Sequence, residues 1–137
     1  MEIILIAIVI IVGLLLLAGI FGSQPYRDLQ SKKDEILGTL DSLHSLISTA
    51  STGELRDIVI RLDKVLGDAL RIKVGREETV GGALKQIRRD YNRNDLNAVW
   101  IYHKMRNSVV HDAIDVTRED VSEMYRVYSS FIKLILK

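Results

Sequence analysis

The feature that most constrains this chain is an uninterrupted apolar run over residues 3–22, IILIAIVIIVGLLLLAGIFG. As a helix, the run would extend roughly 30 Å, which is the thickness of the hydrocarbon core of a bilayer. A cleaved signal peptide is the alternative, and it would place Lys or Arg ahead of a shorter apolar run. Only Met1 and Glu2 precede this one. The run therefore predicts a single transmembrane helix.

The charges that flank the run predict its orientation. No Lys or Arg precedes it, whereas Arg27, Lys32 and Lys33 follow it closely. Positive charge collects on the cytoplasmic side of membrane helices. We therefore expect a single-pass protein of the inner (plasma) membrane, with a transmembrane helix over residues 1–22 and a cytoplasmic helical domain over residues 23–137.

The composition of the chain excludes several kinds of chemistry. The sequence contains no cysteine, which rules out disulfides, thiolate metal sites and cysteine catalysis. The formal net charge is +1, so the chain as a whole has little attraction for nucleic acid. Any RNA binding must therefore depend on a local group of residues.

The part of the chain after the apolar run has the pattern of a helical bundle. Apolar residues recur every three or four positions, which is the spacing of one helix face. Ser51 with Glu54, and Thr117 with Asp120, have the spacing of capping boxes that open helices. The predicted fold class is all-α, with an N-terminal single transmembrane helix followed by a bundle of about five helices. Breaks between these helices are expected at residues 48–53, 75–82, 92–95 and 111–116.

One segment carries residues suited to chemistry, namely residues 103–112, HKMRNSVVHD. Asn107 and His111 are four positions apart, so they share a face of a helix. Arg106 lies about 140° round a straight helix from His111. The guanidinium and the imidazole could converge if the helix ends near His111, or if a second copy of the chain supplies a facing motif.

The arrangement Arg106-Asn107-x-x-x-His111 resembles the R-x4-6-H motif of HEPN domains, in which a polar residue often follows the arginine. The resemblance covers about residues 30–136, and the surroundings of the motif are similar to small bacterial HEPN proteins. Its further elements are the long helix over residues 54–74, the Thr-Val-Gly-Gly segment at residues 79–82, and the Thr-Arg-Glu-Asp helix start at residues 117–120.

The resemblance implies a fold and an activity. HEPN domains are helical bundles that usually dimerise, and the two motifs meet at the dimer interface. Many are metal-independent endoribonucleases that act in phage defence or as toxins, and others have lost activity and serve as binding or assembly modules. This chain keeps the arginine, the polar neighbour and the histidine, so nothing in the motif itself signals loss of activity.

The residue types are suited to cutting RNA without a metal. The ribose 2′-hydroxyl would attack the phosphorus, and His111 would take its proton or protonate the leaving oxygen. Arg106 would hold the phosphate by bidentate hydrogen bonds, and Asn107 would orient the histidine or donate to the phosphate. The expected products carry a 2′,3′-cyclic phosphate and a 5′-hydroxyl, and DNA stays intact because it lacks the 2′-hydroxyl. No cofactor is expected.

These residues also have purely structural interpretations. Arg106 could be a cation near the C-terminal end of its helix that interacts favourably with the helix dipole. His111 could hydrogen-bond to the last carbonyls of the same helix. His103 falls on the apolar face, which favours a satisfied interior or interface histidine over a catalytic one. It could also border the site and, together with Lys104 and Arg88, position the substrate. The three histidines lack the spacing of zinc ligands, so no metal site is expected.

Two functions are consistent with the sequence. The first is a membrane-anchored HEPN-type endoribonuclease that works as a homodimer on RNA, with an antitoxin or sensor protein as a further partner. The second is a catalytically silent, membrane-tethered helical interaction module, which the near-neutral charge favours. Geometry discriminates between them: an open cleft shared by Arg106 and His111 of two chains favours the enzyme, and internal pairing of these residues favours the module.

Overall fold

A computed structural model describes residues 2–22 and 24–137, with side chains for residues 6–16 and 26–137. The described residues form helices joined by short loops and contain no strand, in agreement with the all-α prediction. It divides into two compact units, Met1–Asp34 and Glu35–Lys137. The helices are α1 (Glu2–Gly22), α2 (Gln24–Ile47), α3 (Thr52–Val74), α4 (Val80–Ile87), α5 (Arg93–His111) and α6 (Arg118–Ile135).

The first unit contains α1 and the beginning of α2, and it corrects part of the predicted fold class. The large apolar side chains described in α1 are exposed, Leu15 by 67%. Among the described side chains, no helix is both long enough and apolar enough to cross a membrane. The expected transmembrane helix is therefore not supported, and the corrected fold class is all-α without it.

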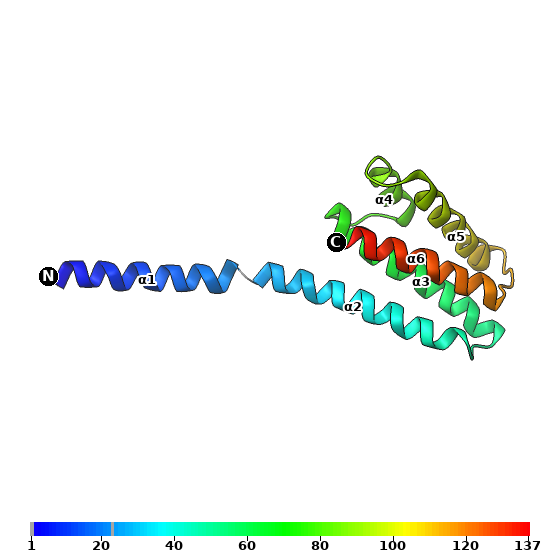
Figure 1. The fold of residues 1–137 in the computed structure, drawn as a ribbon, viewed down its shortest axis with the longest axis horizontal. Helices are drawn as coiled ribbons and strands as arrows, with labels where there is room; N and C mark the ends of the chain where they lie inside the picture. Colours follow the sequence, from blue (N-terminus) through cyan, green and yellow to red (C-terminus); the bar gives the residue numbers. More distant parts are fainter. Residues whose placement is uncertain (1, 23) are drawn as a thin grey trace. The chain divides into compact units, whose positions relative to one another are not determined.

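The second unit is a helical bundle built around α3 and α6. These two helices pack side by side, with α4 and α5 along one side and the last part of α2 along the other (Figure 1). The predicted boundary between residues 22 and 23 falls at Ser23, which lies outside the described residues, and it stays a prediction. The largest fully buried side chains include Leu40 and Leu43 of α2, Leu62 and Leu66 of α3, Leu84 of α4, Val99 of α5, and Met124 and Tyr128 of α6.

Local capping residues fix where the helices begin. Both predicted capping boxes are confirmed, at Ser51–Glu54 for α3 and at Thr117–Asp120 for α6. The linker expected over residues 75–82 is shorter than predicted, because α4 already begins at Val80. The reason is an N-cap: the Thr79 hydroxyl accepts a hydrogen bond from the backbone N–H of Gly82 over 3.0 Å.

Candidate functional site

Asp63 of α3 is a carboxylate in the core of the bundle, only 3% exposed. It lies four positions after Val59 and three before Leu66, so it shares their buried face of the helix. The Tyr128 hydroxyl of α6 donates a hydrogen bond to Asp63 Oδ1 over 2.9 Å. His103 Nδ1 of α5 lies 2.9 Å from the same oxygen. A buried carboxylate requires donors of this kind, and here they join three helices around one charge.

His103 is held by Asp63 in a defined orientation. An ionised carboxylate only accepts hydrogen bonds, so the proton of a neutral His103 ring resides on Nδ1. The Trp100 ring lies edge-on to the imidazole, with the ring centroids 5.7 Å apart. In the described part of the chain His103 Nε2 has no hydrogen-bond partner, and it is not among the buried polar atoms, so it reaches solvent. In the neutral ring this nitrogen is a hydrogen-bond acceptor that is open to a ligand.

Arg106 lies one turn further along α5 and also faces Asp63. Its Nε is 3.5 Å from Asp63 Oδ2, and its Nη1 donates to Asn107 Oδ1 over 3.0 Å. The Nε is buried and has no hydrogen-bond partner, because 3.5 Å with this geometry makes an ion pair only. The side chain is 31% exposed, so part of the guanidinium remains open to a ligand. We call Asp63, His103, Arg106 and Tyr128 the Asp63 cluster.

The environment of Asp63 keeps Tyr128 neutral. Burial of the Tyr128 ring raises the pKa of its hydroxyl, and the nearby negative charge of Asp63 raises this pKa further. Tyr128 therefore acts as a neutral hydrogen-bond donor at physiological pH. Arg106 is the permanently charged partner of Asp63 in the cluster.

His111 lies apart from the Asp63 cluster, on the exposed end of α5. α5 ends at His111, as one of the two expected arrangements required, but residues 106–111 are all helical, so the angle of about 140° between Arg106 and His111 still applies. Within the described residues, no hydrogen bond or ion pair joins the two side chains. One protomer alone therefore does not bring the predicted guanidinium and imidazole together.

A second arginine fixes the end of α5 and the loop that follows. Arg56 of α3 donates to the carbonyl of Val109 over 3.1 Å and to that of Ala113 over 3.2 Å. Its guanidinium also lies 3.7 Å from the Asp115 carboxylate. Ala113 has a φ of 53°, a left-handed conformation that is strained for a residue with a side chain. The contacts of Arg56 on both sides of His111 hold this turn in place.

The remaining predicted residues do not join the cluster. Lys104 and Arg88 are exposed, on α5 and at the end of α4. Of the predicted site residues, the structure brings together Arg106, Asn107 and His103. Asp63 and Tyr128 were missed, although an acidic residue on an otherwise apolar stripe is a signal that could have revealed Asp63. Among the described side chains, no group of three His, Asp or Glu is placed to hold one metal ion.

Comparisons of the chain with known protein families, curated proteins and solved structures found no match. The HEPN resemblance therefore stays a prediction from the motif. The arrangement itself defines the chemistry that is available. Arg106 forms an ion pair with the buried Asp63 carboxylate, and its side chain remains partly exposed. On the same helix, His103, which Asp63 orients, precedes Arg106, and the exposed His111 follows it at the helix end.

Proposed function

We propose that this chain is a metal-independent endoribonuclease of the HEPN type, acting in phage defence or as a toxin. The observation that carries the proposal is the placement of Arg106, with Nε 3.5 Å from buried Asp63 and its side chain 31% exposed. A guanidinium fixed at one edge and open at the other is suited to holding a phosphate. The histidines on either side of it along α5 are His103 and His111.

The proposed reaction is transesterification at one phosphodiester of RNA. An imidazole takes the proton of the ribose 2′-hydroxyl, and the bond from O2′ to phosphorus forms. The bond from phosphorus to O5′ breaks, and a second imidazole, as its imidazolium, protonates O5′. Arg106 stabilises the negative charge that grows on the phosphoryl oxygens, and Asn107 holds Arg106 Nη1 in place.

A homodimer completes the proposed site. Arg106 and His111 lie about 140° apart on α5, and their side chains make no hydrogen bond or ion pair with each other among the described residues. A second protomer with its α5 facing the first would place His111 of one chain beside Arg106 of the other. Such an isologous contact is the commonest form of association between identical chains.

The experiment is cleavage of a short RNA by the purified chain in the presence of a chelator. The His111→Ala variant should lose at least about a hundredfold in rate, as expected for removal of a general acid or base. Asn97→Ala, an exposed position on the same helix, is the matched control and should retain the wild-type rate. Full cleavage by the His111→Ala variant would defeat the proposed mechanism.

A second candidate function is a catalytically silent helical interaction module. The internal ion pair between Arg106 and Asp63 favours this function, because the role of Arg106 would then be to neutralise the buried Asp63 charge. In this case the wild-type chain would leave RNA intact at every concentration. Arg106→Ala would then change the stability of the bundle and nothing else.

A further inference from the structure

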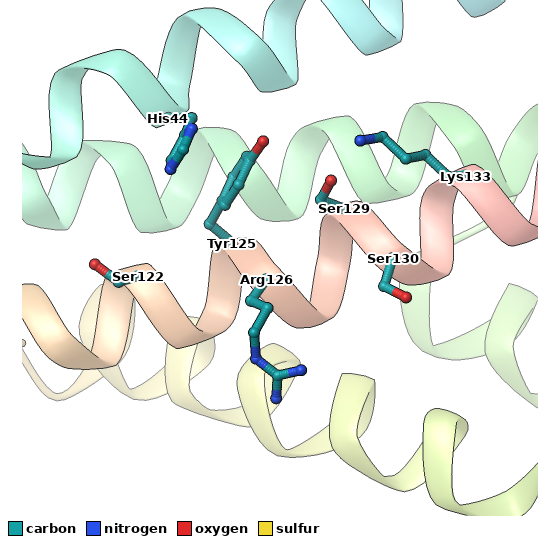
Figure 2. Close-up of a pocket in the computed structure, with 7 residues that line it drawn as sticks. All are labelled: His44, Ser122, Tyr125, Arg126, Ser129, Ser130 and Lys133. Atoms are coloured by element: carbon teal, nitrogen blue, oxygen red, sulfur yellow. The ribbon is translucent and has the colours of Figure 1, made fainter.

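A shallow depression of about 430 Å³ opens between α2 and α6, and none of its residues belongs to the Asp63 cluster. It is lined mostly by polar and basic side chains, and its described lining contains no Asp or Glu. Figure 2 shows the depression and the orientation of its side chains. The lining residues are His44, Ser122, Tyr125, Arg126, Ser129, Ser130 and Lys133.

Three hydrogen-bond donors converge in this depression. Tyr125, Ser129 and Lys133 follow one another at intervals of four residues, so they lie on one face of α6. In Figure 2 the Tyr125 hydroxyl, the Ser129 hydroxyl and the Lys133 ammonium turn toward the same space beside α2. In the described part of the chain, none of these polar atoms has a hydrogen-bond or ion-pair partner.

Ser129 is the most informative of the three donors. The residue is only 7% exposed, and a hydroxyl at such a position is normally hydrogen-bonded. The exposed Ser122, two turns earlier on α6, donates to the carbonyl of Arg118 over 2.8 Å. The Ser129 hydroxyl makes no such bond to the described residues and lines the depression instead. It is not among the buried side-chain atoms that lack a partner, so the hydroxyl is open to the depression and offers a donor there.

The charge of the depression favours an anion. Lys133 supplies a cation without a carboxylate partner in the described residues. Arg126, the second cation of the lining, pairs with Glu123 and turns to the other side of α6 in Figure 2. The three converging donors thus offer one ammonium and two hydroxyls, a set that suits the oxygens of a phosphate.

A flat aromatic surface adjoins the donors. The rings of His44 and Tyr125 are stacked, with centroids 4.3 Å apart and planes 2° from parallel. His44 is an exposed residue, so this stack lies at the surface of the bundle. Any nucleobase can add to such a stack, because every base has a flat π-face.

We propose that this depression is a nucleotide-binding site, which takes a phosphate on Tyr125, Ser129 and Lys133 and a base on the stack of His44 with Tyr125. The phosphate and base can come from a free nucleoside monophosphate or from one unit of an RNA strand. The proposal does not depend on the nuclease function, because no residue is shared with the Asp63 cluster. It adds to this chain a binding site remote from the proposed cleavage site.

The test is calorimetric titration of the full chain with AMP, with inorganic phosphate and with a short oligoribonucleotide. AMP should bind in a saturable manner, and Lys133→Ala should weaken it by roughly tenfold, as expected for loss of a charged hydrogen bond. His44→Ala should reduce the affinity for AMP to that for inorganic phosphate. Lys85→Ala, an exposed lysine of α4, is the matched control and should bind AMP as the wild type does.

The remaining outcomes distinguish an RNA strand from a free nucleotide as the occupant, and they include the results that would overturn the proposal. Much tighter binding of the oligoribonucleotide, lost in Lys133→Ala, identifies an RNA strand as the occupant. Tighter binding of AMP, lost in the same variant, identifies a free nucleotide. Absence of saturable AMP binding, or equal binding by the wild type and Lys133→Ala, overturns the proposal. The RNA cleavage assay reports separately on the Asp63 cluster.

Discussion

Tyr128 stabilises a buried charge through a single hydroxyl, which allows its contribution to be measured. Tyr128→Phe keeps the ring in the core but leaves Asp63 with one donor fewer. We expect the free energy of unfolding to fall by about 1–2 kcal/mol, the cost of an unmade hydrogen bond at a buried acceptor. Urea denaturation at neutral pH measures this loss.

The control for this variant is the neighbouring tyrosine. Tyr102 lies edge-on to Tyr128, with ring centroids 6.5 Å apart, and its hydroxyl has no hydrogen bond to the described residues. Tyr102→Phe should therefore change the free energy of unfolding by less than about 0.5 kcal/mol. Equal losses in the two variants would mean that the bond to Asp63 contributes nothing.

The same hydroxyl makes stability depend on alkaline pH. Burial, and then the charge of Asp63, raise the pKa of Tyr128 above the ordinary value of 10.0. Above that value the unfolded chain releases the proton while the folded chain keeps it, so stability falls as pH rises. The stability advantage of the wild type over Tyr128→Phe should shrink by about 1.4 kcal/mol per pH unit above about pH 10. A constant difference in urea denaturation through that range would contradict the raised pKa.

At the scale of helices, the sequence predicts what is local and misses what is distant. The capping boxes at Ser51 and Thr117 were predictable because each is complete within four residues. The partners of Asp63 lie 40 and 65 positions away, at His103 and Tyr128. A periodicity argument can place Asp63 on the buried face, but only packing of α3 against α5 and α6 supplies its donors.

The end of α5 depends on a neighbouring helix in the same way. Arg56 holds the carbonyls of Val109 and Ala113, which are free at a helix end unless another group donates to them. Arg56→Ala should speed amide hydrogen exchange over residues 109–113 by roughly tenfold, because the last turn opens locally. It should also slow RNA cleavage, since His111 lies in this turn.

Arg61→Ala is the matched control for that variant. Arg61 is also on α3, but its partner is Asp57 of the same helix, at 3.7 Å on the exposed face. Its removal should leave exchange in residues 109–113 unchanged, because pairs of this kind contribute little. Faster exchange in Arg61→Ala to the same degree would mean that general destabilisation, and not the contacts of Arg56, governs this turn.

At the scale of the whole molecule, the proposed nuclease needs more than one copy of the chain. The bundle holds Arg106 against Asp63, while His111 occupies another part of the surface of α5. Rigid helix geometry keeps the two groups apart in a single protomer. A site shared by two protomers also predicts that specific activity rises with protein concentration until the dimer is saturated.

Mixing two inactive variants tests the shared site directly. A dimer of one Arg106→Ala chain and one His111→Ala chain has one site with both groups intact, because each chain supplies the residue that its partner lacks. Random exchange of subunits makes half of the dimers mixed, each with one of two sites, so cleavage should recover to about one quarter of the wild-type rate. If Arg106 and His111 of the same protomer act together, every site in the mixture lacks one of them and the mixture stays inactive. Recovery in the mixture, with neither variant active alone, is the result that requires two protomers at each phosphate.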